Sequence, residues 1–254
     1  MSDLKKGKCC LCGGETVQRC GSCAKYNLSL FFCSKDHQRL IWPTHKLLCG
    51  ERSNPARWPA LTDQEVAYVQ SIRKKPFTKA GETHTIEEVH KGASKSLDDT
   101  LWRLKHPDHP DRFWYNVQLR ALRTKQLWYR HFSGTLTSPG PIPLALLVAS
   151  ELAQQMSGCV RAVYQRAISY DEFDADVETK LMHMLVAIGV VVEMWLRDSG
   201  PKTDTARCLQ TILLNLKEYV LDELPTERPE MANLLKPLPG YCWDVVRTYI
   251  PMPF

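Results

Sequence analysis

The chain has 254 residues, of which 44% are hydrophobic and 24% are charged, and its formal net charge is +5. This length and apolar share exclude a disordered tail and allow one large folded domain or two smaller ones. The excess of positive charge lies in residues 1–50, because residues 51–254 carry equal numbers of acidic and basic side chains. A surface this weakly basic argues against nucleic acid as a partner.

Ten cysteines stand in the chain, and seven of them crowd into the first 49 residues. The first residues lack the charged and then apolar pattern of a secretory leader, so we expect the protein inside the cell, in the nucleus or the cytoplasm. Thiols stay reduced there. Crowded cysteines beside histidines in that setting indicate metal binding rather than a disulfide framework.

The metal-binding pattern consists of four pairs of side chains, with the members of each pair three or four residues apart. Zn²⁺ is bound tetrahedrally by thiolate and imidazole, so eight ligands are enough for two closed sites. Cys9, rather than Cys10, has the Cys-x2-Cys spacing to Cys12. The pairs are Cys9 with Cys12, Cys20 with Cys23, Cys33 with His37, and His45 with Cys49.

Two arrangements of these pairs satisfy the stoichiometry. In the sequential arrangement the first two pairs form one site and the last two form the other, which leaves the second site without a Cys-x2-Cys knuckle. In the crossed arrangement each site has a knuckle, so this arrangement is favoured, although spacing alone leaves both open. The crossed sets are Cys9, Cys12, Cys33 and His37 for the first zinc ion, and Cys20, Cys23, His45 and Cys49 for the second.

Residues 9–49 resemble a MYND zinc finger, a small cross-braced module that binds two zinc ions. The likeness rests on the ligand spacing and on the pattern C-S-K-x-x-Q-x-x-x-W-P-x-H-K-L-x-C that begins at Cys33. Phe32 stands where the family usually has Tyr, and His37 stands where it usually has Cys. The resemblance implies the crossed pairing of the ligands.

The resemblance also implies a partner, because MYND fingers bind short proline-rich peptides of other proteins. The surface used in the family falls on Ser34, Gln38 and Trp42. Ser34 and Gln38 can hydrogen-bond an extended backbone, and Trp42 offers a flat apolar wall to proline rings. The alternative is that Trp42 only packs residues 9–49 against the rest of the protein.

Residues 34–48 are predicted to form two short helices with a break at Pro43. His45 and Cys49 would then lie on one face of the second helix. A module this small cannot fold on apolar burial alone, so metal binding should also supply its folding free energy. Its small core is predicted to consist of Leu40, Ile41, Leu47 and Leu48.

Residues 51–60 have the composition of a linker, and residues 61–254 are predicted to form an all-α domain without strands. Thr62 and Glu65 have capping-box spacing at the start of a helix that runs to Lys75, and residues 76–85 are predicted to form a polar loop. Further helices are predicted over 96–105, 111–131, 144–168, 171–197 and 203–224. A proline-rich tail with one more turn near residues 243–249 should follow.

The most apolar stretch, residues 181–196, is interrupted by a carboxylate at Glu193. It is shorter than the roughly 20 apolar residues that span a membrane, so we predict a buried central helix and no membrane partner. His183 within it should be a core or interface side chain rather than a ligand. The acidic cluster at residues 171–176 suits a helix N-terminus.

We expect a zinc-binding protein–protein interaction module fused to a helical scaffold, an adaptor or regulatory protein rather than an enzyme, with no catalytic residue. No phosphate loop, His-Glu-x-x-His or Gly-x-Ser-x-Gly pattern occurs. The alternative is an enzyme with an unrecognised helical active site, or a divergent S-adenosylmethionine-dependent protein lysine methyltransferase. Some MYND proteins carry a SET domain of that kind, but SET domains are largely β and have an Asn-His-Ser-like motif that this chain lacks.

Overall fold

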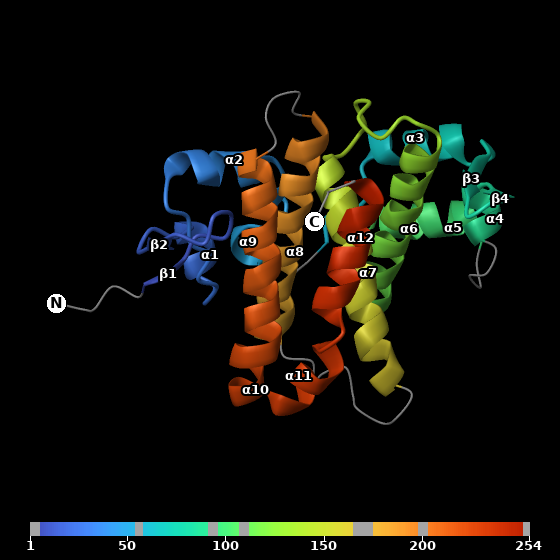
Figure 1. Ribbon diagram of the computed structural model, residues 1–254. Helices are drawn as coiled ribbons and strands as arrows, with labels where there is room; N and C mark the ends of the chain where they lie inside the picture. Colours follow the sequence, from blue (N-terminus) through green and yellow to red (C-terminus); the bar gives the residue numbers. More distant parts are fainter. Residues whose placement is uncertain are drawn as a thin grey trace.

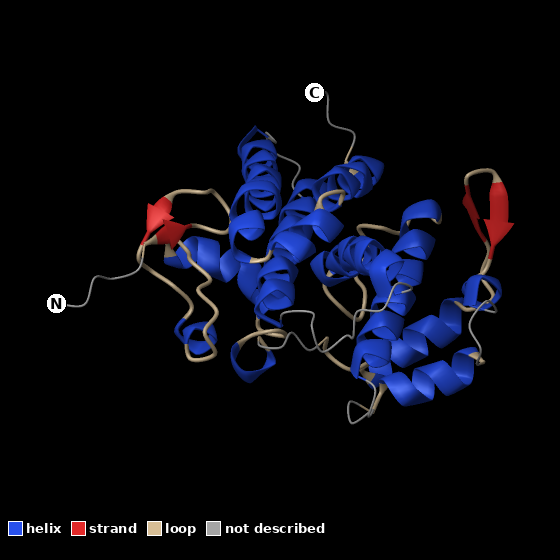
Figure 2. Ribbon diagram, turned by 90° about the horizontal axis from the view of Figure 1, so that it is seen from below, coloured by secondary structure: helices blue, strands red, loops and turns tan. Residues whose placement is uncertain are grey.

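The structure is a computed structural model that describes residues 6–53, 58–90, 96–106, 112–164, 175–197 and 203–250. Two regions follow one another along the chain: residues 9–49, called the finger below, and a predominantly helical region after it. Figures 1 and 2 place the finger at one end of a bundle of long helices and a small β-hairpin at the opposite end. This layout agrees with the predicted fold class of a small finger followed by a helical domain.

The finger has little regular structure apart from one helix of eleven residues. Its elements are β1 (Gly7–Lys8), β2 (Glu15–Thr16), α1 (Gly21–Ala24) and α2 (Lys35–His45), and a 3₁₀ turn (Gly50–Arg52) follows it. Strands β1 and β2 pair antiparallel. Helix α2 begins after Ser34, whose Oγ accepts a hydrogen bond of 3.2 Å from the backbone N–H of His37.

Two sequence predictions within α2 are wrong. The helix continues through Pro43 to His45, because this proline is exposed and stands so near the end that the helix loses only one hydrogen bond. Leu40 is 44% exposed and is no core residue, whereas Ile41 is fully buried. The helical period explains the difference, since Ile41 shares the inward face with Thr44 and His45 while Leu40 lies off that face.

The helical region begins with α3 (Asp63–Ile72), β3 (Phe77–Lys79), β4 (Glu82–His84), α4 (Ile86–His90) and α5 (Leu97–Leu104). The polar loop predicted over residues 76–85 is in fact an antiparallel hairpin in which Phe77 faces His84. Its two-residue turn, Ala80–Gly81, has positive φ at both positions (53° and 84°), the geometry that a tight hairpin requires. Buried Phe77 stacks on Phe132 with ring centroids 6.4 Å apart and so fixes the hairpin to the bundle.

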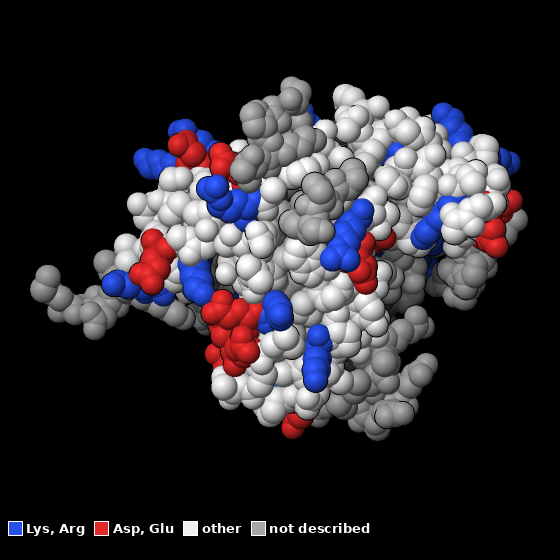
Figure 3. All heavy atoms as spheres, in the orientation of Figure 1, with Lys and Arg blue, Asp and Glu red and all other residues white. Residues whose placement is uncertain are grey.

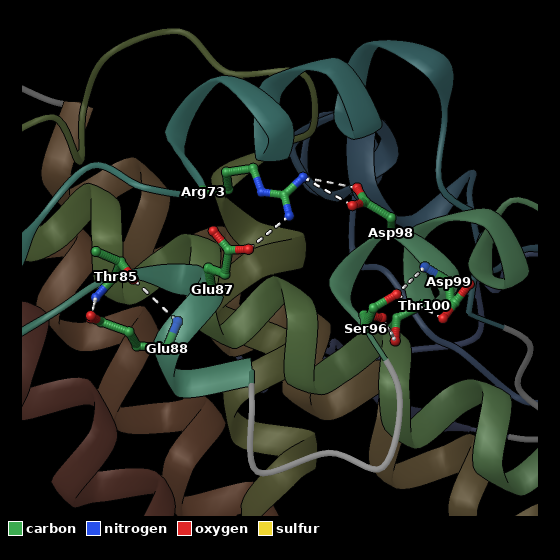
Figure 4. Close-up of polar contacts among 8 residues, drawn as sticks. All are labelled: Arg73, Thr85, Glu87, Glu88, Ser96, Asp98, Asp99 and Thr100. Carbon is green, nitrogen blue, oxygen red and sulfur yellow. Dashed lines mark hydrogen bonds and ion pairs between the residues drawn. The ribbon is translucent and has the colours of Figure 1, made fainter.

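Arg73, directly after α3, ties three short helices together, as Figure 4 shows. Its guanidinium donates to Glu87 of α4 and to Asp98 of α5, each over 2.9 Å. Beside it, Thr85 and Glu88 form a reciprocal capping box at the start of α4, with hydrogen bonds of 2.9 and 3.1 Å. Hydrogen bonding therefore starts a helix that the sequence analysis did not predict.

The core of the helical region is the pair α7 (Leu144–Tyr164) and α8 (Ala175–Arg197), flanked by α6 (Arg112–Phe132) and α9 (Thr203–Glu218). A Cβ atom added to Gly189 would lie 2.3 Å from the carbonyl oxygen of Ala145, so the two central helices touch through their backbones there. Glu193, which interrupts the apolar run, accepts a hydrogen bond of 2.8 Å from the N–H of Ala145. This carboxylate therefore satisfies a donor at the start of α7.

The predicted ranges of these four helices agree with the structure to within a few residues where it describes them. Residues 165–174 and 198–202 lie outside the described residues, and so do the side chains of the acidic cluster at 171–176. Within the described part of the chain, residues 177–197 of α8 are long and apolar enough to cross a membrane, but 67% of their most apolar window is buried inside the protein. This burial agrees with the prediction of a central core helix.

The predicted proline-rich tail is wrong up to residue 242, whereas the turn predicted near residues 243–249 lies within a helix. After α9 the chain continues through a π-helical turn (Tyr219–Glu223) into α10 (Leu224–Glu227), α11 (Pro229–Leu235) and α12 (Leu238–Tyr249). Prolines occupy the first or second position of each of these helices, where a missing N–H costs nothing. Helix α12 packs against α7 and α9 and buries Leu238, Cys242 and Val246.

The end of the predicted linker is packed rather than exposed. Trp58 is only 3% exposed, and its backbone N–H donates to the side chain of Asn116 on α6 over 3.4 Å. Residues 54–57 of the linker lie outside the described residues.

Candidate metal centres and the surface of the finger

The first cluster of metal-ligating side chains joins the β1–β2 turn to the start of α2. The Sγ atoms of Cys12 and Cys33 lie 3.5 Å apart. The Nδ1 atom of His37 lies 3.5 Å from Cys9 Sγ and 3.2 Å from Cys33 Sγ. Because His37 faces the cluster with Nδ1, this histidine keeps the ligand role that the sequence analysis assigned to it.

The second cluster joins α1 to the end of α2 and is more deeply buried. Cys49 Sγ lies 3.6 Å from Cys20 Sγ and 3.7 Å from Cys23 Sγ. His45 faces the cluster with Nε2, which lies 3.5 Å from Cys23 Sγ. The prediction that His45 and Cys49 share a helical face is wrong, because α2 ends at His45 and Cys49 stands beyond the following turn.

Both clusters fit a zinc ion. In each set the four ligand atoms lie within 4.8 Å of one another. Two thiolates bound to zinc at about 2.3 Å in a tetrahedron lie about 3.8 Å apart, and the observed sulfur–sulfur separations are close to this value. Each cluster offers three thiols and one imidazole, a closed structural set, and the crossed pairing is confirmed.

The thiols of the finger differ in electrostatic surroundings, within the clusters as well as beside them. Burial, with a smaller contribution from Cys9, raises the pKa of the Cys10 thiol well above its usual value. The choice of Cys9 over Cys10 rests on geometry, because the Cys9 thiol lies in the first cluster and the Cys10 thiol does not. Hydrogen bonding between Cys20 and Cys23 lowers the pKa of the Cys20 thiol and raises that of the Cys23 thiol, so in the absence of metal the pair holds one thiolate and one thiol.

Aromatic rings surround His45, which is fully buried. The ring of Trp42 meets it edge-on with centroids 5.9 Å apart, and Phe32 lies on another side at 6.4 Å. The third neighbour is His183 of α8, at 5.3 Å. The second cluster therefore lies at the junction between the finger and the helical region, and the prediction of His183 as an interface side chain is confirmed.

The outward face of α2 carries the three residues that the MYND resemblance singled out. Ser34, Gln38 and Trp42 are spaced four residues apart, so they line one side of the helix. Trp42 is 45% exposed, and its edge-on ring contact is with His45 of the finger itself. This exposure argues against the alternative that Trp42 only packs the finger onto the helices.

A cavity of about 580 Å³ lies between the finger and helices α8 and α9. Leu28 and Phe31 of the finger form one wall, and Thr179 and Tyr219 form part of the other. Two ion pairs stand at its walls, namely Lys8 with Glu218 at 2.8 Å and Lys180 with Glu223 at 3.0 Å. Sequence analysis had no signal for this cavity, because its wall in the finger and its wall in α8 and α9 are far apart along the chain.

Charge is mixed over the surface that Figure 3 shows. Basic and acidic side chains stand in small groups, and acidic ones gather over the region where Figure 1 places α9 and α10. Inside the helical region, Glu65 of α3 is fully buried and pairs with Arg123 of α6 at 2.9 Å. Glu65 thus serves the packing of α3 on α6 rather than returning to cap its own helix, although Thr62 does cap α3 as predicted.

Comparison with known proteins identifies the family of the finger. The family model described as MYND finger matches residues 9–49. Egl nine homolog 1 of Mus musculus is 40% identical over 67 residues, which make up 26% of this chain and 16% of that protein's length. No solved structure matches the chain. With the geometry above, residues 9–49 are a MYND finger whose crossed Cys₃His sets fit two zinc ions.

Proposed function

We propose that the finger captures a proline-rich segment of a partner protein, and that the helical region is the scaffold of an adaptor or regulatory protein inside the cell. The observation that carries this proposal is the exposed Trp42 in line with Ser34 and Gln38 on α2. Two thiolate-rich zinc sites also need a compartment that keeps cysteines reduced, which supports the intracellular setting.

The three side chains supply complementary parts of a peptide-binding surface. The Ser34 hydroxyl accepts from the N–H of His37 as a helix cap, yet its own proton remains free to donate to a peptide carbonyl. Gln38, half-buried beside it, offers both a donor and an acceptor. Trp42 gives a rigid apolar plane against which proline rings pack at little entropic cost.

The second zinc site is connected to this surface through His45, which contacts Trp42. Trp42 rests edge-on against His45, whose Nε2 faces the metal cluster. Binding of zinc therefore fixes the ring that supports the tryptophan wall. Peptide capture should consequently depend on zinc even though the peptide touches no ligand.

The test compares Trp42→Ala with Leu40→Ala on an array of proline-rich peptides. Leu40 is the matched control, because it is equally exposed on α2 but lies off the Ser34–Gln38–Trp42 stripe. We expect Trp42→Ala to weaken binding about tenfold or more, the effect of losing an aromatic anchor, with two zinc ions retained. Leu40→Ala should change binding by less than about threefold. Equal loss in both variants, or unchanged binding in Trp42→Ala, contradicts the proposal.

We infer no catalytic role for the helical region, and the use of its buried carboxylates supports this. Glu65 is bound by Arg123 and Gln126, and Glu151 accepts from Trp128 and Tyr249. The competing function is a methyltransferase, and thermal shift with S-adenosylmethionine tests it. A bound cofactor at 100 times its Kd would stabilise the fold by about 2.7 kcal/mol, so a rise in Tm of several degrees would favour the enzyme.

A further inference from the structure

The second zinc site leaves one polar atom of a ligand without a partner. His45 faces the cluster with Nε2, so in the zinc-bound ring the proton resides on Nδ1. This Nδ1 is buried and makes no hydrogen bond within the described part of the chain. Zinc-ligating histidines almost always donate their second N–H to an acceptor, which fixes the ring and tunes the metal.

His183 of α8 presents the complementary atom. Its Nδ1 lies 2.8 Å from the backbone carbonyl oxygen of Thr179, so Nδ1 carries the proton of the neutral ring and Nε2 has a lone pair. This Nε2 is likewise buried, and none of the described residues gives it a partner. His183 is 1% exposed, so bulk water does not take the place of that partner.

The two unpartnered nitrogens belong to neighbouring rings. The centroids of His45 and His183 lie 5.3 Å apart with 63° between the ring planes. An N–H···N hydrogen bond of about 3 Å between two imidazoles places their centroids about 5 Å apart, so the rings are already at the required separation. A small rotation of either ring brings a donor and an acceptor together and satisfies two buried atoms at once, each of which otherwise costs about 1–3 kcal/mol.

We propose that His183 is the outer-sphere acceptor of the second zinc site, so that α8 of the helical region completes a metal centre of the finger. The two regions are then joined by a zinc–His45–His183–Thr179 chain in addition to the packing of α2 against α8. In the first zinc site, by contrast, His37 faces its cluster with Nδ1 and is only partly buried. The two ions therefore differ in role, and the second couples metal binding to the docking of the finger.

The test uses three variants of the zinc-loaded full chain. His183→Leu removes the acceptor, His183→Gln returns an oxygen near the position of Nε2, and Met182→Leu is a volume-conserving control at an equally buried neighbour. Zinc release to a chromogenic chelator gives the rate for each ion, and native mass spectrometry gives the number bound. We expect His183→Leu to release one of the two ions about 10–100-fold faster, with His183→Gln intermediate and Met182→Leu unchanged.

A second measurement needs no variant and separates hydrogen bonding from packing. In ¹⁵N-labelled, zinc-loaded wild-type protein, the proposed bond transmits a scalar coupling between His45 Nδ1 and His183 Nε2. Observation of this coupling supports the proposal. Its absence overturns the proposal, and so does release of both ions at the wild-type rate in His183→Leu. Neither zinc release nor the scalar coupling involves a peptide. The outcome of these two measurements is therefore independent of the peptide-binding test on Trp42→Ala.

Discussion

The finger and the helical region are stabilised in different ways. The finger has two-residue strands and one helix of eleven residues, and its chain is fixed where eight ligands meet at two points. Among the described residues, the helical region has four long helices, of which α7 and α8 form a densely buried central pair with Leu146, Leu185 and Ile188 fully buried. The first fold depends on a bound metal, and the second depends on the fit of side chains.

This difference determines which conditions should unfold each region. The finger should respond to chelators and acid, because its ligands must be deprotonated and its folding free energy is metal-binding free energy. The helical region should respond to changes of volume and to unpaired buried charge, and zinc should matter to it only where α8 faces α2. The predictions below test that separation, from the largest expected effect to the smallest.

Removal of zinc should have the largest effect. Structural zinc contributes about 10–16 kcal/mol to small zinc modules, so a chelator should unfold the finger completely while most helical signal in far-UV circular dichroism remains. Hydrogen exchange should rise throughout residues 9–49 and on the side of α8 near His183. Cooperative loss of α6 and α7 on chelation would show that the two regions are not separable.

Loss of the buried ion pair should come next. Glu65→Ala leaves the Arg123 guanidinium charged and buried without its partner, which should lower the free energy of unfolding of the helical region by about 3–5 kcal/mol. The matched control is Glu223→Ala, because its pair with Lys180 is half exposed and should be worth no more than about 1 kcal/mol. Denaturant titration measures both, and zinc content should stay at two ions in each variant.

Substitution of Gly189 should have a smaller but clear effect. A methyl group there meets the backbone of α7 at Ala145, so Gly189→Ala should destabilise the helical region by about 1–3 kcal/mol by forcing α7 and α8 apart. Gly158 of α7 is the control, since a Cβ added there meets nothing within 4 Å. Gly158→Ala should therefore stabilise the region by about 0.5–1 kcal/mol. Equal signs in the two variants would contradict the close contact of α7 with α8.

The zinc ligands of the finger could be predicted from the sequence because the spacing within each pair is local, whereas the break at Pro43, the core role of Leu40 and the shared helical face of His45 and Cys49 were predicted wrongly. Tetrahedral coordination restricts which spacings are useful, so the ligand pairs stand out along the chain. The long helices were also predictable, since α6, α7 and α9 carry apolar residues at helical period. The match between prediction and structure is best where a single physical rule dominates a segment.

The remaining misses have separate causes. The hairpin at Phe77–His84 has strands of three residues and a turn of Ala80–Gly81, which lacks the usual Asn-Gly signal. Thr85 and Glu88, in contrast, stand at capping-box spacing that could have predicted α4. After residue 224 the prolines begin helices, and an interpretation of proline as a helix breaker concealed them.

Other features could not have been predicted from one sequence. Gly189 and Glu193 interrupt an apolar run in the sequence. Their contacts with Ala145 form only when α7 packs against α8. The ring contact between His45 and His183 likewise joins a residue of the finger to a residue of the helical region. Such contacts depend on tertiary packing, which local propensity does not encode.

Native mass spectrometry of the intact, untreated chain tests the central claim most directly. If two crossed sets of three cysteines and one histidine fold the finger, the measured mass should exceed that of the reduced polypeptide by two zinc ions less the protons that they displace, with every cysteine still a thiol or a thiolate. A mass that corresponds to fewer than two ions, or to disulfides in place of metal, would contradict it.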